Sequence, residues 1–191
     1  MSDSYTPAGY WDSRYLKGGD SGAGSRGDTG RDKALFVNDV IQRHGISSVI
    51  DWGCGDGQVL THMTHAIGYL GIDVSQVVLD RVRGEHPSRL FCLPEEAEGV
   101  TADLALSMDV LFHFPDDADY FAYLQNLFRS ADHMVLIYAT DYDGGQTARH
   151  VRRRNFTPDI TRRYPAWRLV EKAPGVTEDG AEFFLYGNDG G

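Results

Sequence analysis

The sequence contains few cysteines and no long apolar run, and each shortage excludes a class of protein. Cys54 and Cys92 are the only cysteines among 191 residues, which is too few for a disulfide framework. No stretch approaches the roughly 18 consecutive apolar residues that a membrane-spanning helix requires. The polar N-terminus from Met1 to Tyr10 also lacks the apolar segment of a secretory signal. We therefore expect a cytoplasmic protein that makes no membrane contact.

Basic residues are also scarce. The 18 lysines and arginines are outnumbered by 28 aspartates and glutamates, which gives a formal net charge of −10. Because binding to phosphate backbones requires surplus cations, nucleic acid is not an expected partner. Residues 149–163 are the exception, with six arginines and the single acid Asp159. We interpret residues 141–165 as an Arg-rich loop on the substrate side that attracts an anion. The alternative is a solvated, salt-bridged surface.

Length and apolar content predict one domain spanning residues 1–191. Within it, residues 18–30 contain six glycines, which disfavour both helix and strand. The aromatic residues that precede these glycines need a surface to pack against. We therefore predict that residues 1–30 form a short helix and a glycine-rich lid that closes over the body of the domain.

Apolar residues alternate between strand and helix periodicity along the chain. The predicted strands are 47–51, 69–73, 90–93, 103–108, 134–139, 167–170 and 183–186. The predicted helices are 8–17, 32–44, 58–67, 76–84 and one whose first position is Pro115. A frayed tail is expected from Gly187 onward. This alternation predicts an α/β fold, with a Rossmann-like, doubly wound, mostly parallel seven-stranded sheet and an antiparallel C-terminal hairpin.

Residues 48–57 have the pattern of a ligand-binding turn. They read Ser-Val-Ile-Asp-Trp-Gly-Cys-Gly-Asp-Gly and join the end of the first sheet strand to a helix, which is where open α/β sheets bind ligands. Gly53, Gly55 and Gly57 allow the backbone to approach a ligand closely. The dinucleotide fingerprint has a glycine where this sequence has Gln58, which argues against an NAD(P)-dependent oxidoreductase.

Two acids flank this turn in the expected fold. Asp51 precedes the glycines, where its charge would repel a pyrophosphate and attract an ammonium or a sulfonium. Asp73 ends the second strand, from which a carboxylate can accept hydrogen bonds from both hydroxyls of a ribose. The turn and the two acids together indicate a ligand-binding site, whereas a glycine turn with a capping aspartate is the structural alternative.

These motifs resemble those of the class I S-adenosylmethionine-dependent methyltransferases. Residues 49–57 look like the first motif of that family, residues 71–75 like the second, and residues 103–113 like the motif of the fourth strand. The resemblance covers residues 8–187. The head of the chain, residues 10–27, is similar to a subgroup of small bacterial methyltransferases, several of which are associated with carbohydrate or natural-product pathways.

The resemblance implies S-adenosylmethionine as the cofactor. Asp73 is then implied to hold the ribose, Glu95 or its neighbour Glu96 the adenine amine, and Arg14 the carboxylate, the last with the help of the lid. The implied cofactor-binding residues are Asp51, Gly53, Gly55, Gly57, Asp73, Glu95, Ser107 and Arg14.

The fourth-strand motif bears on the methyl acceptor. Amine-methylating members carry an Asn/Asp-Pro-Pro-aromatic signature, whose place here is taken by Ser-Met-Asp-Val at residues 107–110. The resemblance therefore implies O-methylation of a small molecule, with a sugar hydroxyl as one candidate. The predicted partners are this hydroxyl-bearing acceptor, a saccharide or an anionic compound, and a second copy of the chain in a homodimer. The alternative is a non-catalytic module that senses a cofactor or binds a partner.

A hydroxyl acceptor must lose a proton, which requires a base or a metal ion. The catalytic candidates after the fourth and fifth strands are His150, His113 and Asp109. Arginines beside His150 would disfavour its charged form and keep it a free base, whereas His113 alternatively packs against the cofactor. Asp109 and Asp141 form a second option, a site for Mg²⁺, which prefers carboxylate oxygens. The sequence leaves the histidine and metal options open.

Overall fold

In the computed structural model, which describes residues 5–65 and 67–188, strands and helices alternate as the apolar pattern predicts. The strands are β1 (Ser48–Trp52), β2 (Gly68–Ile72), β3 (Leu90–Cys92), β4 (Ala102–Met108), β5 (Ala131–Ala139), β6 (Gly145–Ala148), β7 (Val151–Arg153), β8 (Trp167–Pro174) and β9 (Glu182–Asn188). The α-helices are α1 (Pro7–Leu16), α2 (Gly27–His44), α3 (Gln58–Thr61), α4 (Gln76–Glu85), α5 (Asp117–Arg129) and α6 (Thr157–Arg163). Short 3₁₀ turns cover Ala23–Ser25, Pro94–Ala97 and Leu111–His113. Among the described residues, no helix combines the length and the apolar character needed to cross a membrane.

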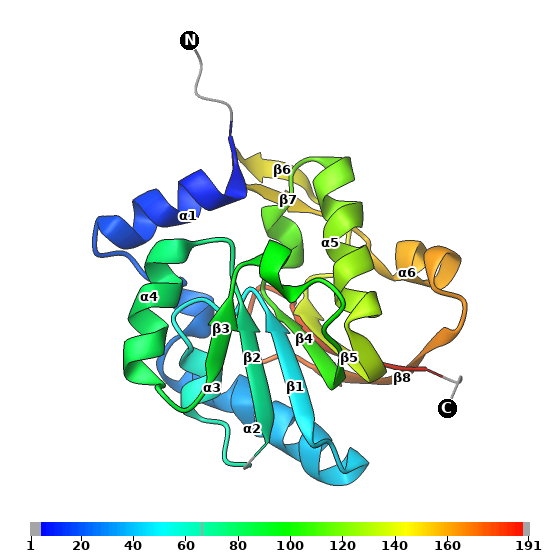
Figure 1. Ribbon diagram of the computed structural model, residues 1–191. Helices are drawn as coiled ribbons and strands as arrows, with labels where there is room; N and C mark the ends of the chain where they lie inside the picture. Colours follow the sequence, from blue (N-terminus) through cyan, green and yellow to red (C-terminus); the bar gives the residue numbers. More distant parts are fainter. Residues whose placement is uncertain (1–4, 66, 189–191) are drawn as a thin grey trace.

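Seven strands form one sheet in the order β3-β2-β1-β4-β5-β9-β8 (Figure 1). The strands β1 to β5 run parallel to one another, whereas β9 lies antiparallel between β5 and β8. The strand order reverses between β1 and β4, and ligands of open α/β sheets bind at the carboxyl ends of the strands at such a reversal. The predicted doubly wound sheet with an antiparallel C-terminal hairpin is therefore confirmed.

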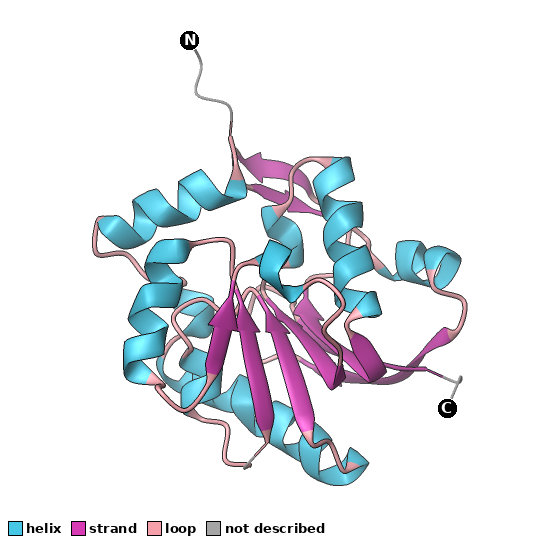
Figure 2. Cartoon of the chain, in the orientation of Figure 1, coloured by secondary structure: helices cyan, strands magenta, loops and turns pink. Residues whose placement is uncertain are grey.

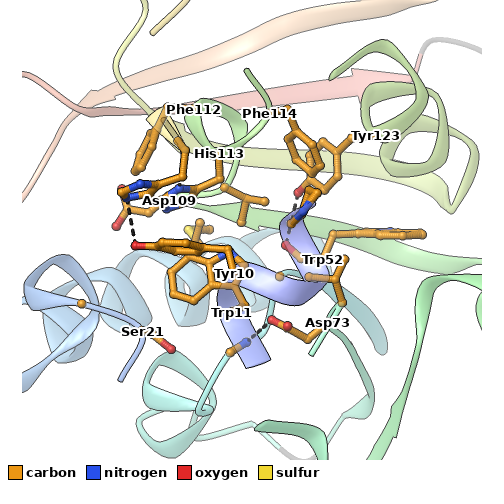
Figure 3. Close-up of a pocket in the computed structure, with 18 of the residues that line it drawn as sticks. Tyr10, Trp11, Ser21, Trp52, Asp73, Asp109, Phe112, His113, Phe114 and Tyr123 are labelled. Atoms are coloured by element: carbon orange, nitrogen blue, oxygen red, sulfur yellow. Dashed lines mark hydrogen bonds between the residues drawn. The ribbon is translucent and has the colours of Figure 1, made fainter. Parts of the chain in front are cut away.

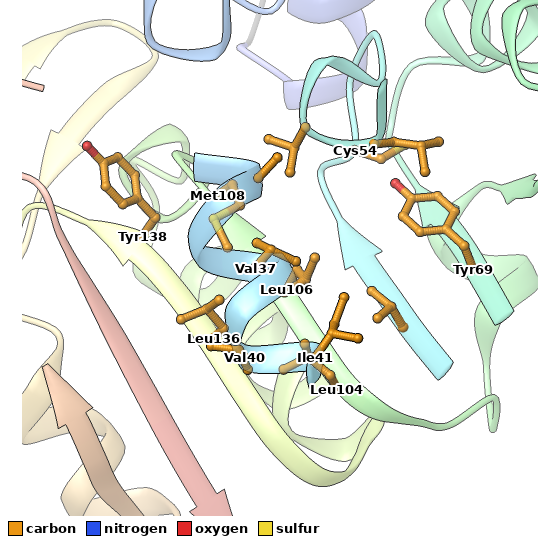
Figure 4. Packing of buried hydrophobic residues seen from close by; sticks show 14 of the residues in the cluster. Val37, Val40, Ile41, Cys54, Tyr69, Leu104, Leu106, Met108, Leu136 and Tyr138 are labelled. Atoms are coloured by element: carbon orange, nitrogen blue, oxygen red, sulfur yellow. The ribbon is translucent and has the colours of Figure 1, made fainter. Parts of the chain in front are cut away.

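Helices cover both faces of the sheet (Figure 2), because successive side chains of a strand point to opposite sides. On one face, Val37, Val40 and Ile41 of α2 cluster with apolar residues of β4 and β5 (Figure 4). On the other face, the buried side of α5 packs with Tyr120 and Leu124 at its centre. Full burial of each such side chain contributes about 1.5–3 kcal/mol, which fixes the strand ends that carry the site.

The N-terminal segment differs from expectation within its glycine-rich part. Helix α1 forms as predicted, with Thr6 as its cap. The glycine content predicts no helix in residues 18–30, but α2 begins at Gly27 and continues through Gly30. A Cβ on Gly30 would overlap the Ser25 carbonyl, so this glycine allows the preceding turn to pack against the helix. The prediction is wrong there because tertiary packing outweighs a helix cost of about 1 kcal/mol per glycine.

Two helix boundaries also differ. Helix α3 ends at Thr61, well short of the predicted 58–67. Helix α5 begins at Asp117, and its cap is Asp116, whose carboxylate accepts hydrogen bonds from two backbone N–H groups of the first turn. Pro115 therefore precedes the helix instead of occupying its first position.

The Arg-rich segment and the C-terminus are more regular than predicted. Residues 141–165 contain the β6–β7 hairpin and α6, where an irregular loop is expected. Strand β9 includes Gly187 and Asn188, so the sheet extends into the expected tail. Residues 189–191 of that tail lie outside the described residues.

We expect Asp116→Ala to lower the free energy of unfolding by about 1 kcal/mol, because two N–H groups at the start of α5 lose their acceptor. Urea denaturation measures the change. Glu178→Ala, at an exposed loop position, is the control and should change stability by less than about 0.5 kcal/mol. Equal stability of the two variants would contradict the capping role.

Candidate functional site

A cavity of about 510 Å³ lies at the carboxyl ends of the parallel strands (Figure 3). Its walls come from α1, the turn after β1, the ends of β2 and β4, α5, and the β6–β7 turn. The lining residues with polar or ring groups that bear on its chemistry are Tyr10, Trp11, Arg14, Asp73, Asp109, His113, Asp119, Tyr123, His150 and Asp179. The fold thus unites motifs that lie far apart in the sequence.

Two glycines of the turn between β1 and α3 line the cavity, so no side chains separate the backbone there from a ligand. Gly53 and Gly55 have φ angles of 81° and 52°, where a side chain is strained. A Cβ on Gly53 would lie 2.5 Å from Val110 Cγ2, and a Cβ on Gly55 would overlap Ser21 Oγ. Both glycines line the cavity, whereas Gly57 lies behind them at the start of α3. The first two are therefore placed to approach a ligand.

Asp73 follows β2, and its carboxylate borders the cavity beside the glycine turn. Its Oδ2 accepts the Gly55 N–H at 3.0 Å (Figure 3), and its Oδ1 accepts the Ser75 N–H at 2.9 Å. Burial raises the pKa of Asp73 to about 6, although these hydrogen bonds act in the opposite direction. Each oxygen keeps a further lone pair, so the carboxylate can accept hydrogen bonds from a ligand as well.

Other residues of the implied cofactor set lie away from the cavity wall. Asp51 accepts a hydrogen bond from the Tyr69 hydroxyl at 2.8 Å, and burial raises its pKa to about 6. Ser107 is fully buried and accepts a hydrogen bond from the Tyr123 hydroxyl at 2.8 Å. Glu95 borders a second hollow of about 680 Å³. The sequence does not distinguish these residues from wall residues, because neighbouring side chains of a strand face opposite sides.

The N-terminal segment closes one side of the cavity. Arg14 lines it, but its Nε donates to the Asp20 carbonyl at 2.6 Å and its Nη2 to the Asp20 carboxylate at 3.4 Å. Ser21 Oγ donates to Asp56 Oδ1 at 2.8 Å, which joins this segment to the glycine turn. Asp12 accepts a hydrogen bond at 2.6 Å from the hydroxyl that caps α4. Both halves of the segment are therefore attached to the walls.

A buried ion pair lies under this segment. The Lys33 side chain is 1% exposed, and its ammonium binds the Asp109 carboxylate and donates to the Gly24 carbonyl at 2.5 Å. Nζ also lies 4.2 Å from the centroid of the Tyr138 ring. Asp109 has a φ of 61°, the one positive φ outside glycine in the described ranges. Such a conformation costs about 1–3 kcal/mol and persists where the surroundings enforce it.

His113 and His150 stack beside Tyr10 at the part of the cavity between α1 and the β6–β7 turn. Tyr10 Oη lies 3.0 Å from His150 Nε2 (dashed line in Figure 3), and the two histidine rings lie 5.7 Å apart with planes 11° from parallel. His113 Nδ1 lies 3.2 Å from the His150 carbonyl oxygen. Because a carbonyl oxygen only accepts, His113 Nδ1 carries the proton and Nε2 the lone pair.

Both histidines have lowered pKa values. Burial lowers the pKa of His113 to about 4. Burial and the nearby charge of Arg14 lower the pKa of His150. The expected direction for His150 is thus correct, but its expected cause, the arginines of its own segment, is not.

Arginines of the Arg-rich segment bind the start of α5. Arg152 and Arg154 both donate to Asp117 Oδ1, at 2.8 and 2.9 Å, and both donate to the Pro115 carbonyl at 2.9 Å. None of the arginines of residues 149–163 borders the cavity. This arrangement favours the alternative of a salt-bridged surface over an anion-attracting rim.

The carboxylates of Asp141 and Asp109, the expected Mg²⁺ ligands, both have protein partners. Asp141 accepts hydrogen bonds from the Phe156 N–H at 2.7 Å and from the Thr157 N–H and hydroxyl at 3.2 and 2.7 Å, at the start of α6. Asp109 is bound by Lys33. In the described part of the chain, no three or more His, Cys, Asp or Glu residues are grouped to hold a metal ion. A Mg²⁺ site at Asp109 and Asp141 stays a prediction, and in this structure their oxygens are bound by the start of α6 and by the Lys33 ammonium.

Several supporting residues escape prediction from the sequence. Lys33 reads as an ordinary surface lysine, although its neighbour Ala34 is fully buried as well. Tyr10 is one of the aromatic residues near the N-terminus that are expected to pack against the domain. Nothing in the sequence pairs it with a histidine 140 positions away. Ser21 lies among glycines that suggest only a loop. The missing signal in each case is a long-range contact.

Residues 50–136 match a family model described as a methyltransferase domain. The structure of magnesium protoporphyrin IX methyltransferase from Synechocystis PCC 6803 with bound S-adenosylmethionine is 14% identical, has a TM-score of 0.73, and aligns over 98% of this chain and 100% of that chain. The N-methyltransferase NodS from Bradyrhizobium japonicum WM9 is 14% identical, with a TM-score of 0.68 and coverage of 86% and 98%.

A third similar structure is the methyltransferase domain of bacterial CtHen1-C, which is 16% identical, with a TM-score of 0.64 and coverage of 83% and 98%. No curated protein matches the sequence. The domain match and the shared fold confirm the resemblance on which the sequence interpretation rests.

Asp51 gives a pH-dependent prediction for stability. Its pKa is raised to about 6, so the folded state holds a proton that the unfolded state releases between about pH 4 and 6, and the resulting stability is lost as pH rises through 6. We expect the unfolding free energy of the wild type, relative to Asp51→Asn, to fall by about 1–2 kcal/mol from pH 5 to 7.5. Urea denaturation across this range measures it.

Tyr69→Phe is the matched variant for this measurement. It removes the hydrogen bond that favours the Asp51 carboxylate, so the same pH dependence should become steeper. Parallel stability curves for the wild type and Asp51→Asn would show that this carboxyl titrates normally.

Proposed function

We propose that this chain, which carries a methyltransferase domain with the class I fold of S-adenosylmethionine-dependent enzymes, methylates a hydroxyl oxygen of a small molecule. The observation that carries this function is the His113 ring, which borders the cavity and whose Nδ1–H is held by a carbonyl, so that its lone pair is on Nε2. A hydroxyl acceptor must lose a proton during methylation, so it needs such a group. A non-catalytic module would have no use for it.

The residues of the cavity fit S-adenosylmethionine, which supplies a methyl group on a positively charged sulfur when bound. Gly53 and Gly55 leave bare backbone for its methionine part. Asp73 keeps lone pairs for the ribose hydroxyls. The Arg14 guanidinium, although bound to Asp20, remains on the wall where a carboxylate would lie. These residues bind and orient the cofactor.

His113 Nε2 receives the acceptor proton. With a pKa lowered to about 4, the ring is neutral throughout the physiological range but is a weak base. A weak base suffices because an oxygen that gains a methyl group becomes positively charged, which makes its proton strongly acidic. His150 has its Nε2 engaged by the Tyr10 hydroxyl, so we assign it the task of orienting His113 through its backbone carbonyl.

The charges around the cavity favour an uncharged acceptor with several hydroxyl groups, such as a saccharide. Asp119 and Asp179 border the cavity together with Asp109, whose charge is paired with Lys33, and Arg14 on the wall already binds Asp20. Carboxylates accept hydrogen bonds from hydroxyl groups and repel anions. Aromatic rings of α1 and of the 3₁₀ turn after β4 supply apolar surface. The same carboxylates make an amine the second candidate acceptor.

Two segments of the single domain, residues 1–191, take separate roles in this function. Residues 5–30 act as the lid on the cofactor side, because Ser21 joins them to Asp56 of the glycine turn. Residues 1–4 of the expected lid lie outside the described residues. Residues 141–165 act on the acceptor side through His150, and their arginines hold the hairpin against α5.

Methyl transfer from radiolabelled S-adenosylmethionine tests the function directly. The acceptor panel contains neutral monosaccharides, phenols, sugar phosphates and primary amines. We expect label in neutral hydroxyl compounds. Label in amines alone would overturn oxygen as the acceptor atom, and the absence of S-adenosylhomocysteine binding in calorimetry would overturn the cofactor assignment.

Asp73→Asn should raise the dissociation constant of S-adenosylhomocysteine roughly tenfold, because charged hydrogen-bond acceptors are stronger than neutral ones by about 1 kcal/mol or more. Since the pKa of Asp73 is about 6, wild-type affinity should also weaken as pH falls from 7 to 5 and the carboxylate is protonated. The variant should lack this pH dependence. Calorimetry at three pH values measures both effects, and identical wild-type and variant profiles would contradict the ribose assignment.

His113→Gln should lower the methylation rate by about 10²–10⁴-fold with little change in S-adenosylhomocysteine affinity. At saturating S-adenosylmethionine, the wild-type rate should stay level between pH 8 and 5.5, because a pKa of about 4 keeps Nε2 unprotonated there. His133→Gln, whose side chain is 64% exposed, is the control and should retain activity. A rate that falls with a midpoint near 6.5, together with an active His113→Gln, would assign the base to another residue.

A further inference from the structure

We propose that Lys33 is a positioning residue, which fastens the N-terminal segment to the corner after β4 and thereby sets the orientation of Asp109 in the cavity wall. Lys33 itself does not border the cavity. Its partners do: Gly24 belongs to the N-terminal segment, and Asp109 follows β4. This role of Lys33 rests on the proposed function, because the cavity that it shapes is proposed to bind the cofactor.

The surroundings of the Lys33 ammonium satisfy it from three elements. Asp109 supplies a carboxylate, Gly24 a carbonyl at 2.5 Å, and Tyr138 of β5 the face of its ring at 4.2 Å. A buried ammonium carries a large desolvation cost unless it is paired and hydrogen-bonded. Because the ammonium needs these partners, it restrains the elements that carry them.

Packing alone does not explain a lysine at this position of α2. The buried residues nearest on the same side of the helix, Ala34, Val37 and Val40, are apolar and fully buried. An apolar side chain at position 33 would avoid the desolvation cost altogether. The charge therefore points to a role in placing its partners.

The residue that Lys33 positions is Asp109. Its φ of 61° is strained for a residue with a side chain. Its Oδ2 is bound by Lys33, and no hydrogen bond within the described residues uses its Oδ1, although Asp109 borders the cavity. Lys33 thus fixes one carboxylate oxygen and leaves the other to accept a hydrogen bond from a ligand in the cavity.

The contact with the N-terminal segment is close. A Cβ on Gly24 would lie 2.9 Å from Asp109 Oδ2 and 3.8 Å from Lys33 Nζ. Gly24 does not have a positive φ, so an added methyl group would act by displacement and not by backbone strain. The charge of Asp179 also acts on Asp109, which places a third loop within reach of this pair.

Trypsin digestion of the folded protein tests the fastening without any ligand. Cleavage after Lys17 and Arg26 reports on the segment, and urea denaturation reports on global stability. Lys33→Met should be cleaved at these sites roughly tenfold faster than the wild type under conditions where both are folded. Lys33→Arg keeps the charge and should restore most of the protection. Cleavage of Lys33→Met at the wild-type rate would overturn the role of Lys33.

Calorimetry with S-adenosylhomocysteine tests the consequence for the site. Lys33→Met should bind roughly tenfold more weakly than the wild type, and Lys33→Arg within about threefold of it. If the wild type does not bind at all, the proposed function fails while the digestion still decides the fastening. If the wild type binds and Lys33→Met binds equally well, the positioning role is wrong.

Gly24→Ala keeps the test decisive if Lys33→Met does not fold. It keeps both charged groups but pushes the segment and the Asp109 carboxylate apart, so it should also accelerate cleavage after Arg26. Gly84→Ala, where an added Cβ meets no atom within 4 Å, is the matched control and should digest like the wild type. Wild-type digestion of Gly24→Ala would overturn the contact between the segment and the pair.

Discussion

An ammonium group without access to water requires oxygen partners, and in this protein that requirement shapes the site around Lys33. Removing one partner of a buried pair commonly costs about 3–5 kcal/mol, because the other charge is left unpaired. That cost exceeds the strain of about 1–3 kcal/mol in the Asp109 backbone. The corner after β4 can therefore keep an unfavourable conformation, and the loop that contains Gly24 is drawn against it.

The distribution of charge supports the same site from outside. Arg152 and Arg154 neutralise Asp117 and bind carbonyls before α5, so the cations of this acidic chain are used to hold elements together. Few cations remain around the cavity, whose wall has Asp73, Asp119 and Asp179 besides the Asp109 that Lys33 neutralises. A cavity with this surplus of carboxylates stabilises a positively charged ligand and disfavours an anion.

The sequence was sufficient for the architecture and for the turn that approaches the ligand. Alternating periodicities define the sheet, and the glycines of residues 53–57 need no long-range information, since their φ angles follow from a local turn. It was insufficient for charged and ring side chains whose role depends on a distant partner. The sequence shows that Asp141 is acidic, but only the fold shows that its oxygens accept hydrogen bonds from the start of α6. Likewise, only the fold shows that His150 Nε2 meets Tyr10.

The position of β9 has a consequence for how the protein forms during synthesis. β9 lies inside the sheet, between β5 and β8, although it follows both of them along the chain. Until β9 emerges from the ribosome, β5 presents an apolar edge with unpaired backbone groups, and such edges pair readily with other chains. Closure of the sheet then requires a contact between segments more than forty residues apart, since Met134 pairs with Gly187, and long-range pairing of this kind is slow. The nascent chain is thus most prone to aggregation in the interval after β5 has been synthesised and before β9 has been synthesised.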